Sequence, residues 1–170
     1  MDVVEHWDEV KNLFKASFRS SMHFAIASVN EQNQPHVTPI GSLILGEPGR
    51  GFYFEEFTRN LPKNIETNNE VCVLAVNSSR WFWLKSLIGG RFETRPAVRL
   101  YGKAGQLREA TNTERELFLK RVKSVRFSKG HEILWQRMAR VRELEFSRIE
   151  PVLLGQMTPF GVSGLTSTSA

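Results

Sequence analysis

The stretch from Phe24 to Val76 constrains the fold more than any other part of the chain. It contains four apolar segments that are separated by turn-forming residues and by one short polar segment of helical character. The apolar segments are Phe24–Val29, Val37–Leu45, Phe52–Phe57 and Val71–Val76. Apolar runs rich in β-branched and aromatic residues, bounded by Asn, Gly and Pro, are typical of short strands. We therefore predict a mainly β fold.

Outside this stretch, the sequence predicts further helices and two more strands. Between Val3 and Phe18, apolar residues recur every three or four positions, which is typical of an amphipathic helix. Three more helical segments are expected: 61–69 with Asn60 as its N-cap, 113–123 capped by Thr113, and 131–140. Two more strands are expected over 98–107, with bends at Gly102 and Gly105, and over 141–149. The segment over 78–96 is expected to be irregular. Because strands cluster instead of alternating with helices, we predict a largely antiparallel barrel with peripheral helices.

Alternation along the strands also assigns their faces. In the strand over 52–57, Phe52 and Phe54 are expected to pack, while Tyr53 and Glu55 face the other way. The segment over 71–76 is apolar on both faces, which indicates a strand in the middle of the sheet.

Composition limits the class of protein. A chain of 170 residues with 41% hydrophobic residues can bury one core, so we expect one domain over 1–157 and a flexible tail over 158–170. The N-terminus has no apolar signal segment, and no stretch approaches the roughly 18 apolar residues of a membrane span, which predicts a cytoplasmic protein. The net charge of +5 suggests an acidic partner, but excess Lys and Arg on solvated faces explains it better. Without a block of five like charges, a nucleic-acid tail is not indicated.

The segment from Thr58 to Asn64 carries the clearest chemical signal. Arg59 and Lys63 are four residues apart near the start of a predicted helix, so their side chains can project to the same side. The free N–H groups of a helix N-terminus and the Thr58 hydroxyl add hydrogen-bond donors, which together suit a phosphate group. A capped helix with two solvated cations explains the same residues, and the sequence leaves both interpretations open.

Two other groups of residues are ambiguous. His36 and Thr38 share a face of their strand, where they either contact a ligand or form a polar outer surface. Trp81, Phe82 and Trp83 offer a stacking surface for a planar ring, although a hydrophobic subunit interface explains them better. The sequence contains no glycine-rich nucleotide-binding loop and no metal-ligand spacing, so a cofactor is expected to carry any chemistry. No catalytic residue can be assigned.

The order and spacing of these segments resemble the pyridoxamine 5′-phosphate oxidase-like family, which has the FMN-binding split-barrel fold. The matching motifs are Ala27-Ser28-Val29, Pro35-His36-Val37-Thr38-Pro39-Ile40-Gly41, Gly51-Phe52-Tyr53-Phe54, residues 64–73 and residues 99–104. The resemblance implies a homodimer with FMN at the subunit interface. Combined with the cationic segment, it suggests the following cofactor-binding residues: His36, Thr38, Pro39, Ile40, Gly41, Phe54, Glu55, Thr58, Arg59, Asn60 and Lys63.

The chain departs from the true oxidases at several positions of their motifs. Thr38 stands where they carry an Arg, Leu43 where they carry a substrate-binding Lys, and Asn60-Leu61 where they carry an Arg-Lys pair. Their C-terminal Arg and His motif has no counterpart near residues 151–158. We therefore expect an FMN-binding oxidoreductase for an unknown small molecule and not a genuine pyridoxamine phosphate oxidase. The alternatives are another cofactor, either a deazaflavin or haem, and a non-enzymatic cofactor-binding module.

Overall fold

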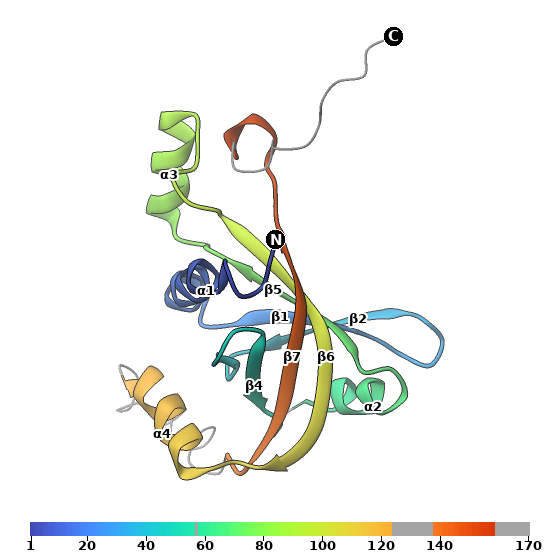
Figure 1. The fold of residues 1–170 in the computed structure, drawn as a ribbon. Coiled ribbons are helices and arrows are strands. Elements are labelled where there is room, and N and C mark those ends of the chain that lie inside the picture. Colours follow the sequence, from blue (N-terminus) through green and yellow to red (C-terminus); the bar gives the residue numbers. More distant parts are fainter. Residues whose placement is uncertain (57, 124–137, 159–170) are drawn as a thin grey trace.

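The computed structural model describes residues 1–56, 58–123 and 138–158. Seven antiparallel strands form one sheet in the order β2-β1-β5-β6-β7-β4-β3. The strands are β1 (Phe24–Val29), β2 (Pro35–Ile40), β3 (Ile44–Leu45), β4 (Arg50–Phe54), β5 (Glu70–Val76), β6 (Ala97–Glu109) and β7 (Arg140–Pro151). The sheet curls without closing, because β2 and β3 remain at its two edges (Figure 1). The predicted antiparallel split barrel is thus confirmed.

Helices surround the sheet. They are α1 (Trp7–Ser21), α2 (Asn60–Thr67), α3 (Arg80–Gly89), α4 (Asn112–Arg121) and a short 3-10 helix, η2 (Gly155–Met157). The predicted N-terminal helix is confirmed, although α1 begins at Trp7 and not at Val3. In Figure 1, α1 and α4 lie beside the barrel, whereas α3 and η2 extend beyond one end of it.

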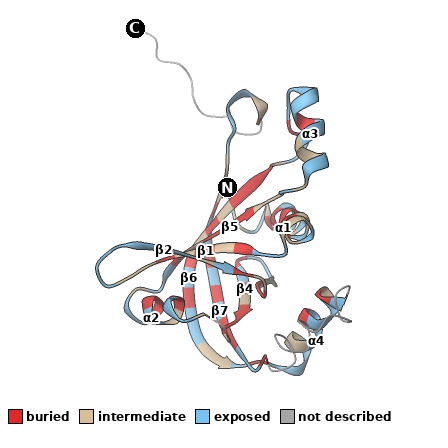
Figure 2. Cartoon of the chain, turned by 180° about the vertical axis from the view of Figure 1, so that it is seen from behind, coloured by how far each residue is buried: buried red, intermediate tan, exposed pale blue. Residues whose placement is uncertain are grey.

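Two apolar clusters stabilise this arrangement. The larger fills the barrel beneath α1 and includes Ile26, Val73 and Leu100, which have no exposed surface. The smaller packs α4 against the sheet through Phe118 and Phe54, whose ring centroids lie 5.4 Å apart. Figure 2 shows the resulting buried segments on the central strands. Each fully buried aliphatic side chain contributes about 1.5–3 kcal/mol, so the clusters dominate the stability of the fold.

The predicted strand over residues 37–45 is divided in two. β2 ends at Ile40 on one edge of the sheet, and β3 begins at Ile44 on the other edge. Between them, Gly41 passes so close to α1 that a Cβ there would lie 3.1 Å from the Met22 carbonyl oxygen. The prediction missed the division because both pieces are apolar, and periodicity within one segment does not reveal which strand it pairs with.

Tyr53 and Glu55 face away from Phe52 and Phe54, as predicted, but the expectation that packing falls on the Phe52 and Phe54 face missed the burial of the opposite face. Tyr53 has no exposed surface and Glu55 only 5%, while Phe54 is also buried. The barrel interior covers the Tyr53 side, and the cluster beneath α4 covers the Phe54 side. Residue 57, the predicted end of this strand, lies outside the described residues.

The segment over residues 78–96 is not irregular throughout, because it contains α3. The Ser79 hydroxyl caps this helix by accepting a hydrogen bond from the Phe82 N–H at 3.4 Å. Gly90 ends it in the left-handed conformation, with φ of 67°. A Ser cap and a C-terminal Gly are ordinary helix boundary signals, but the aromatic residues between them are poor helix formers and hid the helix.

Two predicted helix caps are displaced. Thr111, not Thr113, caps α4, and Glu114 completes a capping box by accepting from the Thr111 N–H. In α2 the N-cap position is occupied by Arg59 and Asn60 is the first helical residue, without a side-chain cap. The helices themselves are confirmed, since apolar spacing fixes their existence better than their exact ends.

The central position of β5 and the two last strands are confirmed. β5 pairs with β1 and β6, although only one of its faces is fully buried. β6 and β7 shift register between Tyr101 and Gly102, as expected for a bulge. A Cβ on Gly102 would lie 2.0 Å from the Glu145 carbonyl oxygen, so only glycine fits there.

Two expectations fall on parts of the chain that are not described. Most of the predicted helical segment over 131–140 lies outside the described residues; Met138 and Ala139 have no regular structure, and Arg140 begins β7. Of the predicted tail over 158–170, only Thr158 is described.

Candidate functional site

Five of the predicted cofactor residues line one cavity of about 170 Å³. They are Pro39, Ile40, Gly41, Phe54 and Thr58. The remaining wall comes from α1, from α4 and from the segments beside them: Phe18, Met22, Ser42, Phe118, Val122 and Met138. A largely apolar cavity with a few polar groups is the usual form of a small-molecule site.

The backbone beside the cavity is held by hydrogen bonds from a single side chain. The Ser42 hydroxyl donates to the Phe54 carbonyl oxygen and accepts from the Phe54 N–H, both at 3.1 Å. These bonds join the chain leaving β2 to the end of β4, although the two strands lie at opposite sides of the sheet order. The segment from Pro39 to Ser42 is therefore a fixed wall of the cavity.

Thr58 supplies a polar atom that lacks a partner. Its Oγ1 is buried and forms no hydrogen bond with any other residue that the structure describes. An unsatisfied buried hydroxyl costs about 1–3 kcal/mol, so such atoms are uncommon unless a ligand satisfies them. Because Thr58 also lines the cavity, its hydroxyl fits a ligand oxygen at this position.

The start of α2 adds two cations next to Thr58. Arg59 and Lys63 are exposed, and neither forms an ion pair within the described ranges. No side chain caps α2, so the N–H groups of its first turn remain available, except at Pro62, which has none. Cationic side chains and free helix N–H groups both attract anions, phosphate groups included.

His36 connects β2 to this helix. Its Nε2 accepts a hydrogen bond from the Asn60 amide at 3.2 Å, and its Nδ1 lies 3.4 Å from the Thr38 hydroxyl. The tautomer with a proton on Nδ1 satisfies both contacts. A second amide, that of Asn64, donates to the Ser28 hydroxyl at 2.9 Å. His36, Thr38 and Asn60 thus position α2 and its cations against the sheet.

Glu55 lies in the barrel interior, away from the cavity lining. It accepts two hydrogen bonds from Arg142, one of them at 2.6 Å, and a third from the Tyr53 hydroxyl at 2.6 Å. Burial and the Glu55 carboxylate both raise the pKa of Tyr53, so its proton stays in place. The hydrogen bond to Glu55 raises the pKa of Arg142. The Glu55 side chain is therefore fully engaged within the protein.

Several residues of the site could not be found from the sequence. Phe18 carries the spacing of an ordinary core residue, and no motif marks Phe118 in α4 or Val122 directly after it. These residues reach the cavity only through the packing of α1 and α4 against the barrel. The buried partner of Glu55, Arg142, is 87 residues distant in the sequence, so no local pattern connects the two.

Two features are absent from the described residues. No group of three His, Cys, Asp or Glu side chains is arranged to hold a metal ion among them. No helix in the same ranges combines the length and apolar character needed to cross a membrane.

Comparison with known proteins places the chain in a family. The family described as pyridoxamine 5′-phosphate oxidase matches residues 10–151. HupZ from Group A Streptococcus is 19% identical with a TM-score of 0.56, over 85% of this chain and 92% of that one. An FMN-binding protein from Syntrophomonas wolfei subsp. wolfei is 11% identical with a TM-score of 0.55, over 88% and 94%. An F420 reductase is 9% identical with a TM-score of 0.52, over 81% and 95%.

At these identities the solved structures show a shared fold and no more. No curated protein sequence gave a significant match. The family match, in contrast, spans most of the chain and includes every residue of the cavity and of the α2 corner. The chain belongs to the pyridoxamine 5′-phosphate oxidase family.

Proposed function

We propose that this protein binds FMN without a covalent bond and acts as an oxidoreductase on a small molecule. One observation carries the proposal. Residues at the ends of β2 and β4 line the same cavity, and Thr58, which also lines it, directly precedes the uncapped start of α2. The structural likeness to an FMN-binding protein supports the same cofactor. When bound, FMN would supply the electron transfer, and the protein would supply binding and orientation.

The residues divide into two groups by the part of FMN they suit. Arg59 and Lys63, with the N-terminus of α2, suit the phosphate, because charge-assisted hydrogen bonds to phosphate oxygens are strong. The Thr58 hydroxyl lies between this corner and the cavity and has no protein partner in the described chain. The backbone from Pro39 to Gly41 suits the flavin ring, because it lines the cavity and Ile40 and Gly41 carry N–H groups.

Two buried leucines argue against pyridoxamine phosphate as the substrate. Leu43 and Leu61 occupy positions where the true oxidases carry Lys, and both side chains have no exposed surface. They fill the main core, so neither position can offer a group to a ligand. We therefore propose a different small-molecule substrate.

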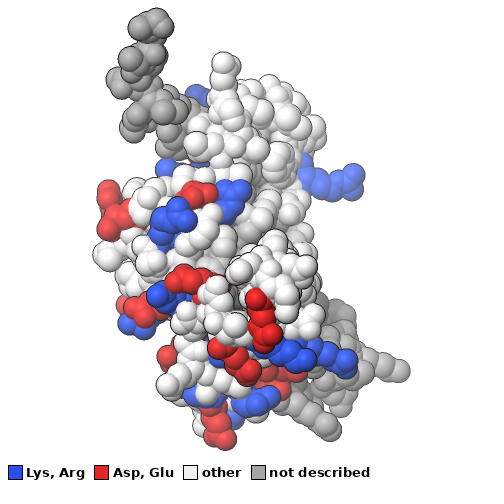
Figure 3. Space-filling view, turned by 90° about the vertical axis from the view of Figure 1, so that its right-hand side faces the viewer, with Lys and Arg blue, Asp and Glu red and all other residues white. Residues whose placement is uncertain are grey.

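We also propose that the protein is a homodimer with the cofactor near the subunit contact. On α3, Trp81 is 73% exposed and Ile88 is 80% exposed, which is unusual for large apolar side chains. On the outer face of β2, Val37 is 63% exposed. In Figure 3, where α3 is turned away from the viewer, the end of the molecule next to η2 carries few charged side chains on the face in view. A second copy of the chain is the simplest cover for such surfaces.

Light scattering after size exclusion tests the dimer. Serine at both Trp81 and Ile88 should yield monomers if α3 forms the contact. Leu117→Ser, at an exposed position on α4, is the matched control and should leave the oligomeric state unchanged. A native protein of monomeric mass would refute the homodimer.

Absorbance and FMN titration test the cofactor. The purified protein should be yellow or should bind added FMN at micromolar concentration. Replacing both Arg59 and Lys63 by Ala should weaken FMN binding by about 10- to 100-fold, because two charge-assisted contacts are lost. Lys103→Ala is the control, since Lys103 pairs with Glu70 on the barrel. Unchanged FMN affinity in the double variant would mean that the corner is only a helix start with solvated cations.

A deazaflavin is the second candidate cofactor. The structural likeness to an F420 reductase favours it, as does the replacement of the oxidases' basic pair by Asn60 and Leu61. The absorption spectrum of the released ligand separates a deazaflavin from FMN and from haem. A bound cofactor without turnover of any electron donor would instead favour a non-enzymatic carrier.

A further inference from the structure

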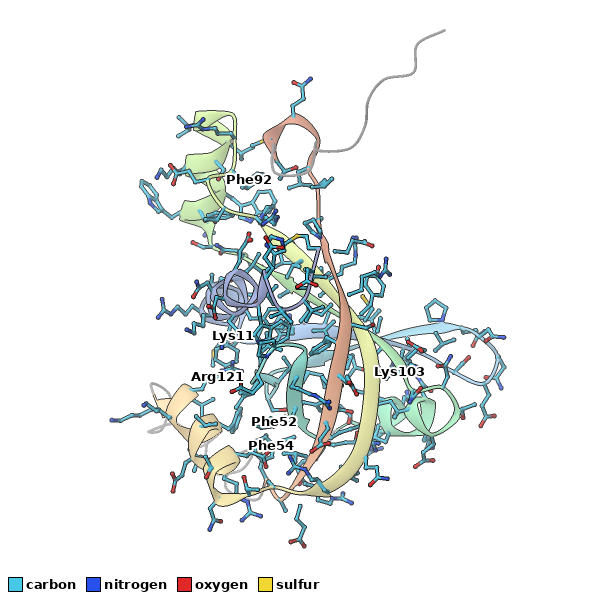
Figure 4. All side chains as sticks on the ribbon, viewed as in Figure 1. Lys11, Phe52, Phe54, Phe92, Lys103 and Arg121 are labelled. Carbon is cyan, nitrogen blue, oxygen red and sulfur yellow. The ribbon has the colours of Figure 1, made fainter. Side chains whose placement is uncertain are left out.

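The cavity has an arginine side chain directly behind its wall. Arg121 projects from the last turn of α4, and Figure 4 places it between α4 and α1. Its guanidinium carbon lies 4.7 Å from the centre of the Phe18 ring, which lines the cavity. One of its N–H groups donates to the carbonyl oxygen of Leu43, the residue that follows Ser42 in the cavity wall.

Arg121 has no carboxylate partner among the described residues. The one side-chain hydrogen bond that it makes there goes to a neutral carbonyl group, and its other contacts are the aromatic faces of Phe18 and Phe24. Burial lowers its pKa to about 10, so the group still carries its positive charge at neutral pH. Among the described residues, no carboxylate therefore offsets the positive charge of Arg121, which is half-buried next to the cavity.

Such a charge affects what the cavity can bind. In the interior, charges are poorly screened and act over several ångströms, so an anion in the cavity is attracted even without direct contact. The rest of the lining is mostly apolar, and Thr58 provides a hydroxyl without a partner in the described chain. A neutral polar ligand would gain less from Arg121 than an anion would, and a cation would be repelled.

We propose that the cavity selects an apolar ligand that carries one negative charge, and that Arg121 determines this selectivity. The inference builds on the proposed function by taking the cavity as the place where the small-molecule substrate meets the cofactor. It assigns the substrate to the class of aromatic or aliphatic acids. Arg121 acts here through its charge and not as a catalytic residue.

Two probes of the same shape test the charge preference. 2-Naphthoate is an aromatic anion, and 2-naphthamide is its neutral isostere; both are titrated calorimetrically into the protein as purified. The naphthoate should bind about tenfold more tightly or better, as expected for a single charge acting at this range. In Arg121→Gln, which keeps a donor for the Leu43 carbonyl, the two affinities should become equal within a factor of about three.

Two further variants separate charge from structure. Arg121→Lys keeps the charge and should keep most of the preference for naphthoate. Lys120→Gln removes an exposed charge from the same helix and should leave the preference unchanged. Absence of naphthoate binding to the native protein, equal binding of both probes, or a preference that survives in Arg121→Gln would each overturn the proposal.

Flavin absorbance of the same samples separates this proposal from that for FMN. A native protein that prefers naphthoate but binds no FMN supports the role of Arg121 and refutes the cofactor. A native protein that binds FMN but does not distinguish the probes refutes the role of Arg121 alone.

Discussion

Arg142 and Arg121 both carry a guanidinium group toward the interior, from β7 and from α4, but their surroundings differ. Arg142 meets the Glu55 carboxylate in a two-pronged contact, to which the Tyr53 hydroxyl and the Gly105 carbonyl group add hydrogen bonds. Arg121 meets one carbonyl oxygen and two aromatic rings. The first group is satisfied by the fold itself, whereas the second keeps a charge that can act on a ligand.

This difference distinguishes an arginine that stabilises the fold, Arg142, from one whose charge is available to a ligand, Arg121. A paired buried charge is costly to disturb because the remaining partner cannot reach water. A half-buried charge without a counter-charge costs free energy on folding, so its presence needs another explanation. The predictions that follow test this contrast, in order of decreasing effect on stability.

The largest effect is expected from Glu55→Gln. The variant leaves Arg142 buried without a counter-charge, which should lower the free energy of unfolding by about 3–5 kcal/mol in urea titrations. Glu145→Gln is the matched control, because Glu145 pairs with Arg50 at the surface and should change stability by less than about 1 kcal/mol. Equal effects of the two variants would remove the distinction between interior and surface pairs.

An intermediate effect is expected from the ion pair that anchors α4. Glu114 accepts from Arg108 at 2.7 Å, and this bond, with help from Thr111, lowers the pKa of Glu114 to about 2. Because the folded pKa lies below the unfolded value of about 4.5, the pair stabilises the protein above pH 4.5 and loses this contribution as the pH falls toward 2.

Unfolding measured between pH 6 and pH 3 should show this loss as about 1 kcal/mol, because Arg108 is partly exposed to water. The loss should be absent from Glu114→Gln. A native-like pH dependence in that variant would assign the acid sensitivity to other carboxylates.

The smallest effect is expected from Arg121→Met. The variant removes an unpaired charge and replaces it with an apolar side chain of similar length, so stability should change by about 1 kcal/mol or less. Thermal unfolding measures this directly. A loss as large as that of Glu55→Gln would mean that Arg121 holds α4 in place, and the contrast between the two arginines would fail.

The pattern of apolar residues predicted most strands well, because the residue types within a strand reflect which of its side chains are buried. The bounds of β1 match the prediction residue for residue, and the cationic segment does lie at the start of a helix. Failures occurred where a distant segment decides the outcome. Tyr53 packs inward because the barrel curls over it, and residues 37–45 divide because their two halves join opposite edges of the sheet.

The candidate site was predicted in part for the same reason. Pro39 and Thr58 were selected from their motifs and do line one cavity, whereas Glu55 was selected from its position and is engaged by Arg142 instead. Phe18 and Arg121 carry no motif, so only the packing of two helices could reveal them. The aromatic segment over 81–83 belongs to α3, which was not predicted because aromatic residues have a low helix propensity.

The sequence by itself determined the class of fold, the approximate positions of most strands and the cationic segment at the start of α2. These follow from periodicity and composition, which depend on residues close together in the chain. The tertiary structure decided which side chains share the cavity, and that Arg142 has a carboxylate partner whereas Arg121 has none among the described residues. Those relations join residues as far apart as Leu43 and Arg121, and only the folded chain brings their atoms together.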